Sequence, residues 1–183
     1  LADHAQVVRA VAQTVAMAPV DALVNSAGIS GPNMKSWDYP LDEWRKVMDI
    51  NVNGLYYCCR EIVPHMKARN KGRIVNIASV AGLGPSGSSI AYAVSKAGLI
   101  HLTKCMAVAL APEVLVNCVA PGLLEGTRAT ANLRPEAIET GRKAALLGVA
   151  ADKDDCADQV VTMCRTNTMT GQTIVIDSGR TFH

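Results

Sequence analysis

The chain has 183 residues, of which 49% are hydrophobic and 19% are charged, and its formal net charge is +2. This balance is typical of one globular domain with a sizeable core, and it excludes a disordered chain. No basic run is long enough for a nucleic-acid footprint, and no apolar run reaches the roughly 18 residues that span a bilayer. We therefore expect neither a nucleic acid nor a membrane as a partner.

Apolar residues recur at helical spacing over 2–17, which predicts an amphipathic helix. The short apolar run at 21–28, DALVNSAG, predicts a buried strand that ends in small and turn-forming residues. A long helix is expected over 40–69, with an acidic first turn and a kink at Pro64 late in its course. The next strand is predicted at 73–79, RIVNIAS, and a loop rich in glycine and serine follows it.

A helix is predicted over 90–111 and a third strand over 114–120. Residues 121–143 are expected to form a loop with a short helix, and 154–165 and 171–179 a last helix and strand. Strands that alternate with helices and are almost continuously apolar favour an α/β fold with a doubly wound parallel sheet, covered on both faces. No repeat or linker divides the sequence, so the chain is treated as a single domain.

The six cysteines lie mostly inside apolar runs, and none forms a C-x-x-C pair. Buried free thiols in a reducing compartment account for this usage, so we expect a cytoplasmic protein. The four histidines do not combine with these cysteines into a zinc-binding motif, and no metal site is predicted.

The hexapeptide GLGPSG at 82–87 matches the G-x-G-x-x-G pattern that holds a dinucleotide pyrophosphate. It also lies between a predicted strand and a predicted helix, as that pattern requires. However, Pro85 removes a backbone N–H that the phosphate would need, and no acidic residue follows at the expected distance. We interpret the match as a coincidence within a loop rich in glycine and serine.

Tyr92 and Lys96, in the stretch AYAVSK, are four positions apart and share a face of the predicted helix. A free phenol has a pKa of about 10, and a nearby ammonium group would lower it, so the pair can exchange a proton with a carbonyl or alcohol oxygen. Such a pair often arises by chance. Here, however, Asn25 and Ser79 stand at the predicted carboxyl ends of strands, where parallel sheets bind ligands, and Asn51 lies in a helix nearby.

The stretches LVNSAG, MDINVNG, GRIVNIASVAG, AYAVSKAG, VNCVAPG and TGQTIVIDSG occur in this order and cover nearly the whole chain. With them the sequence resembles the short-chain dehydrogenase/reductase family, of the single-domain type that includes 3-oxoacyl-carrier-protein reductases and sugar dehydrogenases. The resemblance implies a Rossmann-like fold, NAD or NADP as cofactor, and hydride transfer that interconverts an alcohol and a carbonyl.

The resemblance also implies a role for each matching residue. Tyr92 is the catalytic acid/base, Lys96 lowers its pKa and holds the nicotinamide ribose, and Ser79 binds the substrate oxygen. Asn51 supports a water relay to the lysine. The implied cofactor contacts, besides Tyr92 and Lys96, are Asn25, Ala27, Gly28, Pro121, Gly122 and Leu124. Arg128 and Arg134 are candidates for binding an anionic substrate group, or else ordinary solvated loop residues.

The family normally begins with the strands and the glycine-rich turn that bind pyrophosphate and adenosine and that choose NAD or NADP. These elements do not occur within 1–183, so we expect the C-terminal portion of a dinucleotide-binding domain, in which the strand at 21–28 is an apolar edge. If that front half is truly missing, the alternative is a non-catalytic binding or scaffold protein on the same fold.

Two further expectations concern assembly and motion. The helices at 41–69 and 90–111 carry apolar residues on more than one face, and in the resembling family they form a four-helix bundle, which implies a homodimer or homotetramer. Residues 123–143 combine glycines and a proline with a short helix and no strong apolar stripe. This pattern predicts the most mobile stretch of the chain, of the kind that forms a lid.

Overall fold

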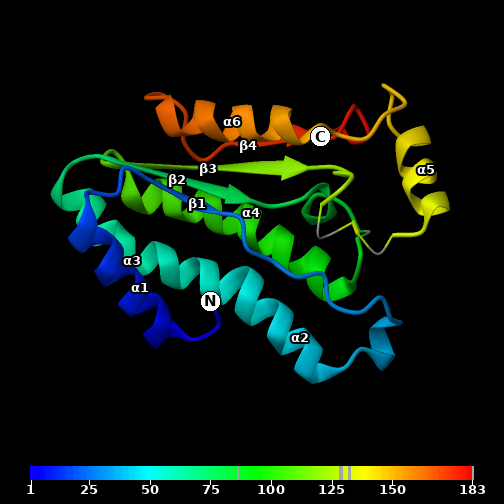
Figure 1. The fold of residues 1–183 in the computed structure, drawn as a ribbon, viewed down its shortest axis with the longest axis horizontal. Helices are drawn as coiled ribbons and strands as arrows, with labels where there is room; N and C mark the ends of the chain where they lie inside the picture. Colours follow the sequence, from blue (N-terminus) through cyan, green and yellow to red (C-terminus); the bar gives the residue numbers. More distant parts are fainter. Residues whose placement is uncertain (86, 128–129, 132, 183) are drawn as a thin grey trace.

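The computed structural model describes residues 1–85, 87–127, 130–131 and 133–182. Its centre is one sheet of four parallel strands in the order β1-β2-β3-β4 (Figure 1). The strands are β1 (Ala22–Asn25), β2 (Gly72–Ile77), β3 (Val114–Pro121) and β4 (Thr173–Ile176). Because neighbouring strands run in the same direction, each is joined to the next by a crossover that contains a helix. The α/β fold with a parallel sheet, predicted from the sequence, is confirmed.

Helices cover both faces of this sheet (Figure 1). On one face lie α3 (Gly54–Ala68) and α4 (Ile90–Leu110), with α1 (His4–Met17) packed against α3, and on the other lies α6 (Lys153–Arg165). The short α5 (Pro135–Lys143) stands apart, beyond the carboxyl ends of the strands. Within the described part of the chain, α4 alone is long and apolar enough to cross a membrane, and here it packs along the sheet.

The predicted helix over 40–69 is wrong in one respect, because it is not a continuous α-helix. It consists of α2 (Leu41–Met48), a π-helical turn η2 (Asp49–Asn53) and α3, which follow one another without a break. Pro64 lies inside α3, as expected. A π turn adds one residue to a helical repeat and often marks a functional site. Here it contains Asn51, whose side chain is fully buried.

Three strands end earlier than predicted, since β1, β2 and β4 stop at Asn25, Ile77 and Ile176. Ser79 therefore lies two residues beyond β2 instead of at its end. There its hydroxyl accepts a hydrogen bond from the Ala81 amide at 3.2 Å and begins the short helix η3 (Val80–Gly82). After β4 the backbone turns left-handed at Ser178 and Gly179, which ends the extended conformation.

The larger core lies between the sheet and helices α3 and α4. Its fully or almost fully buried members are Cys59, Ile62, Met66, Ile74, Met106, Ala107, Val114 and Val116. A smaller cluster on the opposite face joins Val75 and Val119 to Met163 of α6. Neighbouring strand residues thus point to opposite faces, and both faces are apolar, as a sheet covered on both sides requires.

All six cysteines are free. Cys59, Cys118 and Cys156 are buried, Cys58 and Cys164 are half-buried, and Cys105 is exposed on α4. The expectation of free thiols is therefore confirmed, while the expectation that they are buried is wrong for Cys105.

A chain of buried polar side chains connects β1, β2 and α4. Asn25 Nδ2 donates to Asn76 Oδ1 at 2.9 Å, and Asn76 Nδ2 donates to Thr103 Oγ1 at 2.9 Å. The Thr103 hydroxyl in turn donates to the Leu99 carbonyl of its own helix at 2.9 Å. Buried polar groups are stable only when they find such partners, so this chain fixes how the two strands sit on α4.

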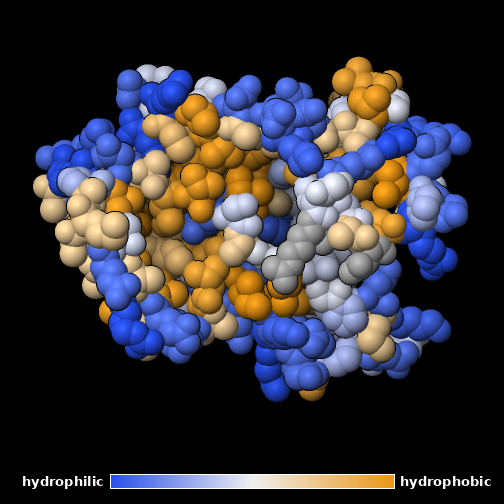
Figure 2. Space-filling view, in the orientation of Figure 1, coloured by the Kyte–Doolittle hydropathy of each residue, from blue (hydrophilic) through white to orange (hydrophobic). Residues whose placement is uncertain are grey.

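The edge of β1 opposite β2 pairs with no strand in the described part of the chain. Val24 on this strand is 44% exposed, although it lies in an apolar run. Figure 2 shows apolar surface on this side of the molecule, between α6 and the helices α1 and α3. The apolar edge expected from the sequence is therefore present, and such an edge is a template for pairing with another strand.

Asn76→Ala removes the acceptor for Asn25 and the donor to Thr103. Each partner loses one buried hydrogen bond, so Asn25 is left with its contact to Cys59 and Thr103 with its bond to the Leu99 carbonyl. We expect the free energy of unfolding to fall by about 3 kcal/mol, measured by urea denaturation. Asn53→Ala is the control, because the Asn53 side chain bonds Asp49 on the exposed surface, and it should change stability by less than about 0.5 kcal/mol. Equal losses in the two variants would contradict this account.

Candidate active site

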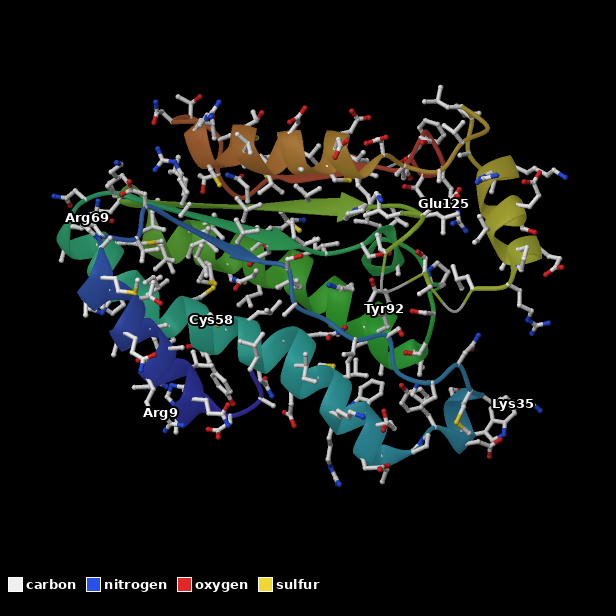
Figure 3. All side chains as sticks on the ribbon, in the orientation of Figure 1. Arg9, Lys35, Cys58, Arg69, Tyr92 and Glu125 are labelled. Carbon is white, nitrogen blue, oxygen red and sulfur yellow. The ribbon has the colours of Figure 1, made fainter. Side chains whose placement is uncertain are left out.

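The carboxyl ends of the strands, the π turn η2 and the first turns of α4 meet at one end of the sheet. Figure 3 places Tyr92 at this end, on α4 beneath the strand ends, with Glu125 above it on the segment after β3. Four of the residues selected from the sequence converge here: Asn51 from η2, Ser79 after β2, and Tyr92 and Lys96 from α4. Ligands of parallel α/β sheets bind at this end.

Ser89 fixes the position of Tyr92 by starting the helix that carries it. The Ser89 hydroxyl is the N-cap of α4 and accepts a hydrogen bond from the Tyr92 amide at 3.0 Å. The same hydroxyl donates to the Ser30 carbonyl at 2.5 Å. The loop that follows β1 is therefore tied to the helix turn that bears Tyr92.

Lys96 is a buried cation. Its side chain is only 4% exposed, and its Nζ donates to the Ile77 carbonyl at the end of β2 at 2.7 Å. The ammonium group also lies 5.6 Å from the centroid of the Tyr92 ring. Burial disfavours the charged form and lowers the pKa of Lys96 to about 8, from 10.5. The pKa of Lys96 is thus close enough to neutral pH for the lysine to exchange a proton.

The pKa of Tyr92 is shifted in the opposite direction from that of Lys96. Burial raises the pKa of its phenol, and a hydrogen bond from the Ser79 side chain opposes this rise only in part. The expectation that Lys96 lowers the pKa of Tyr92 stays a prediction. In this structure the ammonium group donates to the Ile77 carbonyl. Tyr92 keeps its proton at neutral pH and is available as an acid.

Asn51 is held by three hydrogen bonds. Its Oδ1 accepts from the Ile29 amide at 2.8 Å, and its Nδ2 donates to the Ile29 carbonyl at 2.9 Å. The second Nδ2 proton goes to the Ser95 hydroxyl at 3.0 Å, and that hydroxyl donates to the Tyr92 carbonyl at 2.7 Å. Sequence reasoning did not select Ser95. The only signal for Ser95 was its place within AYAVSK, three residues after Tyr92.

Gly28 is the point at which these groups meet. A Cβ placed on Gly28 would stand 3.4 Å from both Asn51 Oδ1 and Lys96 Nζ. Without a side chain, the exposed backbone after β1 leaves open the space in front of a buried amide and an ammonium group. A ribose hydroxyl needs donors and acceptors of this kind, so the site fits the sugar of a dinucleotide.

The other predicted cofactor contacts have different surroundings, and Asn25 is turned into the protein. Its amide nitrogen is committed to Asn76 and Cys59 inside the protein. Ala27 is half-buried against an apolar cluster that includes Leu55 and Leu99, and Pro121 ends β3. Gly122 packs so closely on Asp177 that a Cβ on it would come within 2.6 Å of that residue, and Leu124 forms a β-bridge with Ala151. Of the two arginines proposed for an anionic substrate group, Arg134 is the exposed N-cap of α5. Arg128 lies outside the described residues.

The GLGPSG loop has a packing role. Gly82 lies in η3 against α4, where a Cβ would come within 2.6 Å of the Lys96 carbonyl carbon. A Cβ on Gly87 would stand 3.0 Å from the Ala81 side chain and 3.6 Å from the Tyr92 ring. These glycines allow the loop to approach the catalytic helix closely, which supports the interpretation that the match to G-x-G-x-x-G is a coincidence.

Comparisons with known proteins agree with this geometry. A family model described as enoyl-(acyl carrier protein) reductase matches residues 1–181. The NAD(+)-dependent 2-dehydro-3-deoxy-L-rhamnonate dehydrogenase of a Sphingomonas species is 44% identical over 127 residues, which are 68% of this chain and 51% of that protein. The 3-oxoacyl-(acyl-carrier-protein) reductase FabG of Chlamydia pneumoniae is 35% identical over 166 residues, which are 89% of this chain and 66% of that protein.

Among solved structures, a gluconate 5-dehydrogenase from Burkholderia cenocepacia in complex with NADP and tartrate superposes with a TM-score of 0.91. It is 28% identical, and the match covers 98% of this chain and 72% of that one. A parallel sheet that is covered by helices on both faces and binds its ligand at the carboxyl ends of the strands is the architecture of Rossmann-like folds. The chain belongs to the short-chain dehydrogenase/reductase family. It spans about half of the length of the first curated relative and about two thirds of the second.

Lys96→Met should stabilise the fold at pH 7, because it replaces a buried charge with an apolar chain of similar length. The folded pKa of about 8 lies below the unfolded value of 10.5, so the unfolded chain binds more protons between these values. Wild-type stability should therefore rise by about 2 kcal/mol between about pH 7 and pH 9.5, and the full cost of burial, about 3 kcal/mol, is present below about pH 8.

Denaturation by urea at a series of pH values measures this effect. The Lys96→Met variant should be the more stable protein at pH 7 and should lack the rise. Lys104→Met on the exposed face of α4 is the control and should keep the wild-type pH dependence. A Lys96→Met variant less stable than wild type at pH 7 would show that Lys96 contributes net stabilising contacts.

Proposed function

We propose that this chain belongs to an NAD(P)-dependent oxidoreductase that interconverts an alcohol and a carbonyl by hydride transfer. The observation that carries the proposal is that Asn51 and Lys96 meet beside the open backbone at Gly28, with the Tyr92 ring next to Lys96 and Ser79 next to Tyr92. Residues of these types in this arrangement move a proton at a substrate oxygen. We propose further that residues 1–183 are part of a single dinucleotide-binding domain.

In this proposal Tyr92 is the acid that gives its proton to a carbonyl oxygen, or the base that takes one from an alcohol. The raised pKa of the buried phenol suits the acid role, because the proton is held until an acceptor oxygen arrives. Ser79, whose side chain lowers the pKa of Tyr92 and so partly offsets the effect of burial, would bond the same substrate oxygen. Lys96, whose pKa is lowered to about 8 by burial, can return a proton to Tyr92.

The nicotinamide cofactor, NAD or NADP, would supply or accept the hydride. Lys96 and the backbone at Gly28 would hold its ribose, and Pro121, Gly122 and Leu124 would present backbone groups to its nicotinamide end. Asn51, locked against Ile29, keeps its side chain beside Lys96 and so supports a water-mediated relay to the lysine. The names of the relatives, which include an NAD(+)-dependent dehydrogenase and an NADP complex, support this assignment.

The substrate proposed here is a small molecule with an alcohol or carbonyl group. Relatives named for a sugar acid, for a carrier-linked acyl group and for gluconate are consistent with this class. Arg134, exposed at the start of α5, is a candidate contact for an anionic substrate group. No observation favours the alternative of a non-catalytic scaffold, since the catalytic residue types are intact and the relatives are named as enzymes. We propose a cytoplasmic location, consistent with six free cysteines.

Tyr92→Phe keeps the ring and its packing but removes the proton that the reaction uses. In the whole protein, the turnover number should fall at least about a hundredfold while the dissociation constant for the nucleotide stays within about twofold. Steady-state kinetics and nucleotide titration measure the two quantities. Tyr56→Phe, on the exposed face of α3, is the matched control and should leave turnover unchanged. Near-normal turnover in the Tyr92→Phe enzyme would refute the proposed function.

We also propose that the protein is a homodimer or homotetramer that buries the outer faces of α3 and α4. Exposed apolar side chains gather on these faces: Tyr56 on α3, and Ile90, Val94 and Val108 on α4. Val108 is 85% exposed, and large exposed apolar patches are rare on monomers. A second copy of the same helices would cover them.

Val108→Asp should therefore weaken assembly, because it places a charge in the proposed interface. Size-exclusion chromatography with light scattering at micromolar concentration should give an oligomer for the wild type and a smaller species for the variant. Val161→Asp on α6, which lies on the other face of the sheet, is the control and should leave the mass unchanged. A monodisperse wild-type monomer would contradict the proposal.

The mobility that the sequence predicts for residues 123–143 stays a prediction.

A further inference from the structure

Ser95 is a buried hydroxyl between two candidate catalytic residues, and the proton transfer proposed above does not use it directly. Its side chain has no solvent exposure. It accepts a hydrogen bond from Asn51 Nδ2 at 3.0 Å and donates one to the Tyr92 carbonyl at 2.7 Å. This one hydroxyl therefore connects the π turn η2 to the first turns of α4.

The direction of these bonds determines the orientation of the Asn51 amide. The Ser95 proton is committed to the Tyr92 carbonyl, so toward Asn51 the hydroxyl can only accept. The Asn51 nitrogen must then face Ser95 and the Ile29 carbonyl, and its oxygen must face the Ile29 amide. A rotation of the amide by half a turn would set oxygen against the Ser95 hydroxyl and the Ile29 carbonyl, and nitrogen against an N–H.

The amide orientation matters because of what lies in front of it. Asn51 Oδ1 and Lys96 Nζ approach the same point beside Gly28, each 3.4 Å from the place of a Cβ there. A rotated or loosened amide would present N–H groups to the Lys96 ammonium, which would disfavour the charged lysine. Ser95 is also the residue before Lys96, so its two bonds fix the helix turn that carries both Tyr92 and Lys96.

We propose that Ser95 is a positioning residue of the proton relay. It holds the Asn51 amide in its working orientation and locks the Tyr92 turn of α4 to the π turn. The inference rests on the proposed function, because it assigns Ser95 a part in that same proton transfer. Ser95 acts through Asn51, and it touches neither substrate nor cofactor.

Thr103, two turns along the same helix, provides a matched control. Its hydroxyl has no solvent exposure, donates to the Leu99 carbonyl at 2.9 Å and accepts from Asn76 Nδ2 at 2.9 Å. The two sites thus share a pattern, in which a helix hydroxyl orients a buried asparagine amide. Only the Ser95 site adjoins Tyr92 and Lys96. Ser95→Ala and Thr103→Val each remove one such hydroxyl and should lower the thermal midpoint of the whole protein by similar amounts.

The experiment compares the turnover number and the Michaelis constants of these variants in the whole protein. Ser95→Ala should lower turnover about tenfold and leave the Michaelis constant for the nucleotide within about twofold, while Thr103→Val should leave both unchanged. Ser95→Thr keeps a hydroxyl that can bond the helix carbonyl, and it should restore turnover to within about threefold of the wild type. In an Asn51→Ala background, Ser95→Ala should cause no further loss, because Ser95 acts through Asn51.

Hydrogen exchange measured by mass spectrometry gives a readout that does not depend on activity. Ser95→Ala should speed exchange in the peptide that contains Asp49–Asn53, and Thr103→Val should not. Unchanged turnover in Ser95→Ala, equal turnover losses in Ser95→Ala and Thr103→Val, or a further loss in the Asn51→Ala background would each overturn the proposal. A different result tests the proposed function itself: normal turnover in the Tyr92→Phe enzyme would refute it. A Tyr92→Phe enzyme that has lost turnover beside a fully active Ser95→Ala enzyme would refute only the role of Ser95.

Discussion

The arrangement of this site depends on keeping an ammonium group in the protein interior. Lys96 is almost fully buried, and one protein hydrogen bond to its nitrogen, accepted by the Ile77 carbonyl, takes the place of solvent. That carbonyl is free to accept because β2 ends at Ile77, so the strand end itself creates the acceptor. Gly82 allows η3 to approach the backbone of Lys96 closely, because a Cβ there would come within 2.6 Å of the Lys96 carbonyl carbon.

The parallel sheet explains why these parts lie together. Parallel strands present all their carboxyl ends at one edge, and each crossover helix starts near that edge. Ser79 follows β2, Gly28 follows β1, and α4 brings Tyr92 and Lys96 back to the same place. The chain of Asn25, Asn76 and Thr103 then fixes the strands on α4 from within. This chain stabilises the fold, while a separate set of buried polar contacts, those of Asn51, Ser95 and Lys96, stabilises the site.

Sequence patterns were sufficient for the order and type of the main elements, because hydrophobic periodicity reports directly which residues are buried. They were insufficient for η2, since a π turn has the same local composition as the α-helix around it, and its extra residue is stabilised by tertiary contacts of Asn51. The pair of Tyr92 and Lys96 could be found by spacing. The direction in which the pKa of Tyr92 is shifted could not, because it depends first on burial and then on Ser79, which no spacing rule reveals. Ser95 could not be selected from the sequence for the same reason, because its role depends on the residues to which it is hydrogen-bonded.

The π turn has a consequence for the rotational phase of the helix that follows it. Each residue of an α-helix advances the chain by about 100° around the axis. The wider turn at Asp49–Asn53 holds one more residue than an α-helical turn, and α3 still presents Cys59, Ile62 and Met66 to the sheet. Because this turn takes up one extra residue within the same rotation, loss of that residue would restore an ordinary helix and leave the apolar stripe facing the core. It would remove the bulge that carries Asn51 to Ile29, so the place of Asn51 depends on this chain length while the packing of α3 does not.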